Sequence, residues 1–167
     1  KVFQEVDGFE GNEKIPSGDD EFLMHKIFAR NKADVKFLKS PEATVYTTAK
    51  STWKEFFNQR KRWAGKWPHY QLKYIKYIAA LILIGNLSFI TWLIVCALQG
   101  KGWELFVILF GLKSFTDAIF IKQVLYSYDK KIKWKYFILT ALFYPFYVSF
   151  FALNSNSVRY EWKGRKL

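Results

Sequence analysis

Three consecutive acids near the N-terminal end have the residue types that acid–base chemistry needs. Asp19, Asp20 and Glu21 directly precede the apolar pair Phe22-Leu23. A carboxylate held at a helix N-terminus can act as a general base, because its surroundings tune its pKa for that task. The plainer explanation is that acids in a first helical turn complement the helix dipole. The residues alone leave both interpretations open.

A second cluster, Gln59-Arg60-Lys61-Arg62-Trp63, is basic and aromatic. Residues three or four apart share one side of a helix, so Gln59, Arg62 and Trp63 are expected to face together. The forked donors of Arg62 could then clamp a pyrophosphate, and Trp63 could offer a flat surface to a sugar ring. The alternative is a juxtamembrane basic patch that binds anionic lipid headgroups.

A small α+β segment is predicted to position these two clusters. A helix is expected from the acids through residue 31, and residues 34–38 and 43–48 have the β-branched and aromatic character of short strands. Ser51 and Thr52 then open a second helix, which carries the basic and aromatic cluster towards residue 67.

Long apolar runs alternate with short basic loops in the second half of the chain. Residues 77–98 contain no charge, and this run exceeds the roughly 20 apolar residues that a membrane-crossing helix needs. Residues 103–121 and 136–153 are predicted as further spans, although the former contains three charges and the latter contains Pro145. Trp and Tyr residues at the edges of the runs are typical of membrane interfaces. The alternative for each run is a buried helix of a large soluble core.

Basic residues are concentrated before the first apolar run and between the second and third, whereas the loop 99–102 offers only Lys101. By the positive-inside rule, the N-terminal segment and the second loop are therefore expected in the cytoplasm. Three full crossings would place the basic tail, residues 154–167, outside. Either the rule is overridden there, or the segment around Pro145 dips into the membrane and returns.

Lys113 and Asp117 lie one turn apart in the second run, where isolated charges are costly. Most simply they pair along the helix. Alternatively they line a polar path or hold an acceptor headgroup within the membrane. The single cysteine, Cys96, excludes an intrachain disulfide and a thiolate metal site, so its expected role is packing.

The chain resembles the C-terminal part of a membrane-bound family 2 glycosyltransferase in three motifs that precede the apolar helices. In order, these motifs are Asp7-Gly8-Phe9, the run 17–23 and the cluster at 59–63. That family includes the cellulose, chitin and hyaluronan synthases. Its pattern is a Glu/Asp-Asp pair followed three residues later by Leu, and then Gln-x-x-Arg-Trp on a helix against the membrane. The resemblance covers residues 2–67 at motif level. Asp7 departs from it, because many relatives have Gly there.

The resemblance implies a role for each matched residue. Asp20 would be the general base that deprotonates the acceptor hydroxyl, and Asp19 would support it. Gln59, Arg62 and Trp63 would hold the donor pyrophosphate and the acceptor sugar, and Asp7-Gly8-Phe9 would form an acceptor loop. The implied reaction transfers a sugar from a nucleotide-sugar donor to a lipid-linked or polysaccharide acceptor, with inversion.

The family's nucleotide-binding half has no counterpart here, since the chain contains no Asp-x-Asp triplet. By resemblance, that missing N-terminal half would bind the divalent cofactor, Mg or Mn, and this chain would supply no metal ligand and would be inactive alone. No nucleic-acid partner is expected. The rival hypothesis is a non-catalytic membrane anchor or scaffold that binds anionic lipid through its basic patch.

The expected fold is therefore a membrane α-helical bundle of two to three spans, preceded by a small α+β segment that is the C-terminal part of a GT-A-type domain. Residues 1–73 would form the cytoplasmic segment with an interfacial helix, residues 74–153 the transmembrane helices, and residues 154–167 a basic tail. The expected location is a bacterial inner membrane.

Overall fold

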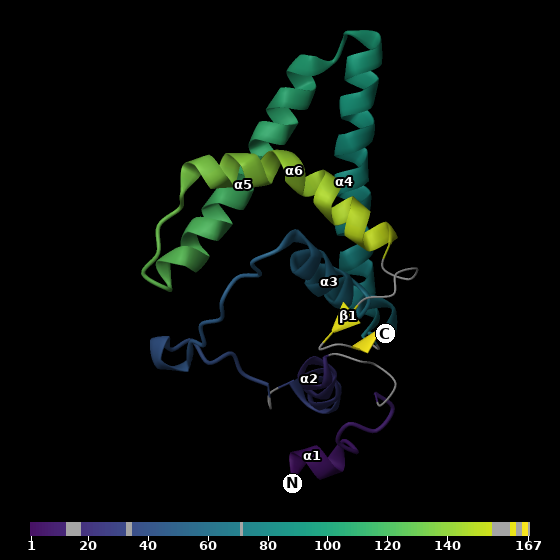
Figure 1. Ribbon diagram of the computed structural model, residues 1–167, viewed down its shortest axis with the longest axis vertical. Coiled ribbons are helices and arrows are strands. Elements are labelled where there is room, and N and C mark those ends of the chain that lie inside the picture. The colour runs from purple at the N-terminus through teal and green to yellow at the C-terminus, as the bar shows by residue number, and fades with distance from the viewer. Residues whose placement is uncertain (13–17, 33–34, 71, 155–160, 163–164, 167) are drawn as a thin grey trace. The chain divides into compact units, whose positions relative to one another are not determined.

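The computed structural model describes residues 1–12, 18–32, 35–70, 72–154, 161–162 and 165–166. Their helices are α1 (Val2–Glu5), α2 (Asp19–Arg30), the 3-10 helix η2 (Pro41–Ala43), α3 (Trp53–Ala64), the 3-10 helix η3 (Trp67–His69), α4 (Lys73–Gln99), α5 (Trp103–Tyr126) and α6 (Trp134–Leu153) (Figure 1). The chain divides into two compact units, residues 1–80 with 151–167, and residues 81–150.

The α+β expectation for the N-terminal segment is wrong in its strands. Residues 35–40 and 44–50 are irregular and join no sheet, and Asp34, the first residue of one expected strand, lies outside the described residues. A strand is stable only where a neighbour pairs with its backbone, and the described residues give these segments no such neighbour. The two-residue strands β1 (Glu161–Trp162) and β2 (Arg165–Lys166) instead pair antiparallel in the tail.

The two expected helices of this segment both form. α2 begins after Gly18, whose left-handed backbone (φ 95°) serves as the N-cap, and it buries Phe22. α3 begins at Trp53, because the Thr52 side chain accepts a 3.2 Å hydrogen bond from the Glu55 amide. It ends at Ala64, earlier than expected, and Gly65 follows it.

The three apolar runs are helical, as predicted. α4 and α6 are long and apolar enough to cross a membrane. α5 is of similar length but carries charges at Glu104, Lys113, Asp117 and Lys122. Most of the large apolar side chains on these helices are exposed, Leu98 by 82% for example, and apolar surface of that extent is suited to lipid or to a partner.

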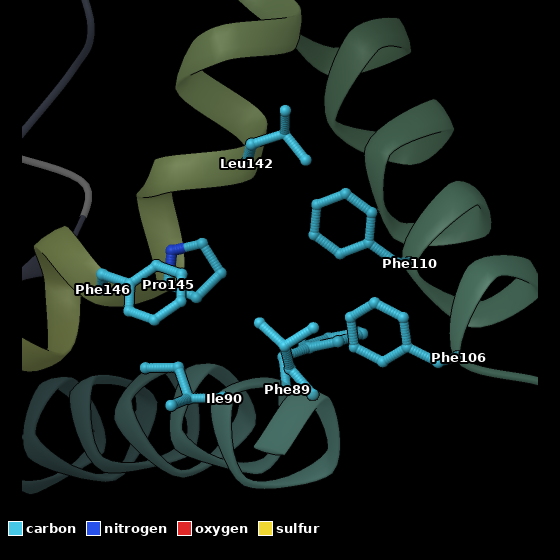
Figure 2. A pocket seen from close by; sticks show the side chains of 8 residues that line it. Phe89, Ile90, Phe106, Phe110, Leu142, Pro145 and Phe146 are labelled. Carbon is cyan, nitrogen blue, oxygen red and sulfur yellow. The ribbon is translucent and has the colours of Figure 1, made fainter. Parts of the chain in front are cut away.

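Within the unit of residues 81–150, α4 and α5 form a helical hairpin whose arms diverge from the turn at 100–102, and α6 lies across both (Figure 1). The Phe89 ring packs edge-on against Phe106 and Phe110, and these side chains face Leu142 and Pro145 around an apolar cavity of about 100 Å³ (Figure 2). Aromatic contacts therefore join α4 to α5 in this unit.

Candidate functional site

The expected acceptor loop is held in place by one lysine of α2. The ammonium of Lys26 donates hydrogen bonds to the carbonyls of Val6, Gly8 and Glu10, at 3.2, 3.1 and 2.7 Å. An ammonium has three N–H donors, so the three contacts use its full capacity. The loop that contains Asp7-Gly8-Phe9 is thereby attached to the helix that begins with the acids.

Both central residues of this loop have left-handed backbone. Gly8 has φ 45°, and a Cβ there would lie 2.5 Å from the ring of Phe3, so only glycine fits without a shift. Asp7 has φ 55°, a conformation that Asp adopts more readily than most residues. Asp7 is thus compatible with a backbone position that favours glycine. The Phe9 ring packs edge-on against Phe3 at 5.2 Å.

The acids occupy the first turn of α2, but their environments differ. Asp19 and Asp20 are exposed to solvent. Glu21 is half-buried: Lys66 donates to its Oε2 at 3.0 Å, and the Tyr70 hydroxyl donates to its Oε1 at 2.6 Å. Among the described residues, Glu21 rather than either aspartate connects the start of α2 to the segment after α3.

The contacts of Glu21 determine its protonation. Burial opposes its ionisation, but the hydrogen bonds from Tyr70 and Lys66 and the charge of Lys66 outweigh that effect, so the pKa of the Glu21 carboxyl is lowered. Burial, together with the bond to the Glu21 carboxylate, raises the pKa of Tyr70. At neutral pH this cluster is an ionised carboxylate held by an ammonium and a neutral phenol.

Lys66 also contacts the turn before the acids. A Cβ at Gly18 would lie 3.1 Å from the side-chain carbons and nitrogen of Lys66, and φ 95° at Gly18 also favours glycine. The backbone preceding Asp19 therefore packs directly against Lys66. The acidic end of α2 and the C-terminal end of α3 are neighbours within one unit.

The basic and aromatic cluster lies in the last two turns of α3. Gln59 and Arg62 are half-buried, and Trp63 is 45% exposed. The guanidinium of Arg60 lies 4.4 Å from the Trp63 ring centroid and 5.0 Å from that of Phe56, within the range of cation–π attraction. Arg60 therefore occupies part of the Trp63 surface that was expected to receive a sugar.

No group of three or more His, Cys, Asp and Glu residues converges to hold a metal ion within the part of the chain that the structure describes. The consecutive acids at 19–21 do not form one, since Glu21 turns towards Lys66 and Tyr70.

Sequence reasoning did not identify Lys26, Lys66 or Tyr70. All three act through contacts with residues at least 16 positions away in the chain, so no local sequence pattern marks them.

The sequence did predict that Lys113 and Asp117 would pair along α5. Their nitrogen and oxygen atoms lie 2.6 Å apart, which confirms the pairing.

Comparisons with models of known protein families, with curated proteins and with solved structures found no match for this chain.

Proposed function

We propose that this chain is part of a membrane-bound inverting glycosyltransferase, which transfers a sugar from a nucleotide-sugar donor to a lipid-linked or polysaccharide acceptor. The observation that carries the proposal is the ordered set of motifs at residues 7–9, 19–23 and 59–63, followed by long apolar helices. The three motifs fall within one compact unit, which is compatible with a shared site.

Three structural features support this assignment. The exposed Asp20 carboxylate is accessible to an incoming hydroxyl group, as a general base must be. Lys66 and Tyr70 donate hydrogen bonds to the neighbouring Glu21. These bonds fix the first turn of α2 and do not use the Asp20 carboxylate. Lys26 connects the Asp7-Gly8-Phe9 loop to the same helix, so loop and base would move together.

The proposed reaction uses Asp20 and Arg62 at opposite ends of the transferred sugar. The acceptor hydroxyl gives its proton to Asp20, and the acceptor oxygen forms a bond to the anomeric carbon. The bond from that carbon to the diphosphate breaks, and its electron pair leaves with the nucleoside diphosphate. Arg62 stabilises the charge that develops on the departing phosphates.

In this proposal the nucleotide and its divalent metal are bound by a nucleotide-binding half outside this sequence. Residues 1–73 lie on the cytoplasmic side of a bacterial inner membrane, α3 lies at the interface, and α4 to α6 anchor the enzyme. Exposed aromatic side chains on α3, among them Trp53 at 79%, suit that interfacial position.

The same exposed aromatic residues and the basic cluster also fit the rival function, an anchor or scaffold for anionic lipid. The two proposals differ at Asp20, because an anchor has no use for a proton acceptor. A neutral substitution there separates them.

The test is sugar transfer in membranes that contain the full-length protein, with Asp20→Asn compared against Asp129→Asn, the same change at an exposed residue between α5 and α6. Asp20→Asn keeps the shape but removes the base, so turnover should fall by on the order of 10²–10⁴, the usual worth of general-base catalysis. Asp129→Asn should change little. If Asp20→Asn stays within about threefold of the parent while folded, the base assignment is wrong and the anchor function is favoured.

A further inference from the structure

A second polar cluster lies in the unit of residues 81–150, far in sequence from the proposed site. The ammonium of Lys113 lies 2.6 Å from Oδ2 of Asp117 on α5, and 5.5 Å from the centroid of the Tyr144 ring on α6. Charged groups on an apolar helix are costly to keep, so they commonly serve binding or transport. Their mutual pairing reduces that cost but leaves the second carboxylate oxygen of Asp117 available.

Asp117 borders an open pocket of about 280 Å³ between α5 and α6. The polar residues of its lining are Asp117, Thr140 and Tyr144, and the apolar ones are Phe120, Ile121, Phe137 and Ala141. The volume exceeds the roughly 150 Å³ of an engineered cavity that holds benzene, so the pocket is large enough for an organic group rather than a single water.

These groups select the charge of a ligand. The Lys113–Asp117 pair is neutral overall, and the member that borders the pocket is the carboxylate. An anionic headgroup would face that carboxylate, and a cationic one would compete with Lys113 for it. A neutral hydroxyl group can donate to Asp117, while its apolar remainder contacts the aromatic lining.

We propose that the pocket between α5 and α6 binds the headgroup of a neutral lipid alcohol, with its hydroxyl group on Asp117 and its hydrocarbon chain against Phe120 and Phe137. This inference rests on the proposed membrane insertion but not on sugar transfer. Retention of the protein in membranes after alkaline carbonate washing tests the insertion separately.

The experiment uses the full-length protein in phosphatidylcholine nanodiscs. The three probes are photoreactive analogues of hexadecanol, hexadecanoic acid and hexadecylamine, which have equal chain length. Mass spectrometry then locates the labelled residues. The alcohol should label residues 117–121 and 137–144 saturably, and unlabelled hexadecanol should compete. The acid and the amine should not label these residues saturably.

Variants test each part of the site. Asp117→Asn should weaken alcohol labelling by on the order of tenfold, the worth of a hydrogen bond to a charged group. Asp117→Asn also removes the partner of Lys113, so a second variant that leaves this pair intact is needed. Thr140→Val keeps the side-chain shape and removes one hydroxyl group. Its matched control is Thr116→Val, an exposed α5 threonine that bonds the Leu112 carbonyl. Ala141→Phe should fill the pocket and abolish saturable labelling.

Three results would overturn the proposal. One is unsaturable labelling spread over the exposed faces of α4 to α6, which indicates partition into lipid only. Another is saturable labelling by the acid equal to that by the alcohol. The third is unchanged alcohol labelling in Ala141→Phe, since a filled pocket cannot hold a headgroup.

Discussion

The hydroxyl of Tyr70 donates a 2.6 Å hydrogen bond to Oε1 of Glu21, and so joins the segment before α4 to the first turn of α2. The ring of Tyr70 also packs edge-on against His25 at 5.2 Å. Lys66 completes the cluster from the other carboxylate oxygen. The start of the acidic helix is therefore fixed by residues that lie 45 and 49 positions away in the chain.

Removal of the Tyr70 hydroxyl should destabilise the unit of residues 1–80. We expect Tyr70→Phe to lower the free energy of unfolding by about 1 kcal/mol, because a partly exposed bond to a carboxylate is lost while the ring packing remains. Tyr77→Phe, at an exposed tyrosine of α4, should have no such effect. Thermal unfolding of the purified protein in detergent, followed by tryptophan fluorescence, measures both. Equal melting temperatures for the two variants would show that the bond contributes nothing.

The lowered pKa of Glu21 predicts a specific acid sensitivity. Its folded-state pKa lies below the ordinary value of 4.5, so the ionised carboxylate contributes its full stabilisation above about pH 4.5. That contribution is lost as the pH falls through the lowered folded-state value. The stability difference between the parent and Glu21→Gln should therefore be largest near neutral pH and should shrink below pH 4.5.

The variant Glu10→Gln serves as the control for loss of one negative charge, because Glu10 is exposed. Its stability difference from the parent should not follow the same profile. Melting temperatures measured from about pH 3 to about pH 7, on both sides of the ordinary carboxyl pKa, give both differences. A Glu21→Gln difference that grows as the pH falls would contradict the assignment.

Lys26 should control the order of the loop of residues 6–10. The amides of Gly8 and Glu10 are hydrogen-bonded to the carbonyls of Phe3 and Asp7, at 2.8 and 2.9 Å, so they are expected to exchange slowly. Lys26→Met keeps the length of the side chain but removes its donors. We expect exchange at these two amides to accelerate by on the order of tenfold, because the loop then opens more often. Hydrogen exchange with mass spectrometry reports the change.

The matched control for this experiment is Lys32→Met. Lys32 is an exposed lysine whose ammonium lies 5.7 Å from the centroid of the Phe28 ring. It contributes the same charge without the three carbonyl contacts. Similar exchange in the two lysine variants would mean that net charge, rather than the contacts of Lys26, orders the loop.

The helices were predictable because their signals are local. The apolar length of residues 77–98, the cap at Thr52 and the acids before Phe22 each act within a few residues, and each corresponds to a helix in the structure. Strand prediction failed at residues 43–48 for the opposite reason. A β-branched sequence favours a strand, but only a partner strand elsewhere can stabilise it.

The sequence indicated the helices that carry the candidate residues but not the contacts that those residues make. The position of Asp20 on a helix followed from its neighbours, whereas the engagement of Glu21 by Tyr70 depends on how two distant segments pack. The coverage of Trp63 by Arg60 is local, at a spacing of three residues in a helix, and the sequence could have indicated it. Lys26, which holds the loop of residues 6–10, carried no such signal.

The loop charges predict a topology that cysteine labelling can test. In a Cys96→Ala background, single cysteines at Lys101 and Lys131 should label from opposite sides of the membrane, with position 131 on the cytoplasmic side. Cys96 is fully buried, and its replacement leaves the introduced cysteine as the single thiol of each variant. Labelling of both positions by an impermeant reagent from one side would refute a crossing by α5.

The last prediction separates the proposed roles of Arg62 and Trp63 in sugar transfer by the full-length protein. Arg62→Ala removes a charge that is proposed to contact the diphosphate before and during transfer. We therefore expect weaker donor binding and lower turnover together. Trp63→Ala removes a surface on which the acceptor sugar is proposed to stack, so it should chiefly raise the KM for the acceptor.

Arg60→Ala provides the internal comparison, because it uncovers the Trp63 ring without removing it. If the stacking role is correct, Arg60→Ala should leave the acceptor KM unchanged or lower it, whereas Trp63→Ala raises it. Initial rates with each substrate varied in turn would distinguish these patterns. A rise in the donor KM alone for Trp63→Ala would instead place the ring at the nucleotide-sugar side of the site.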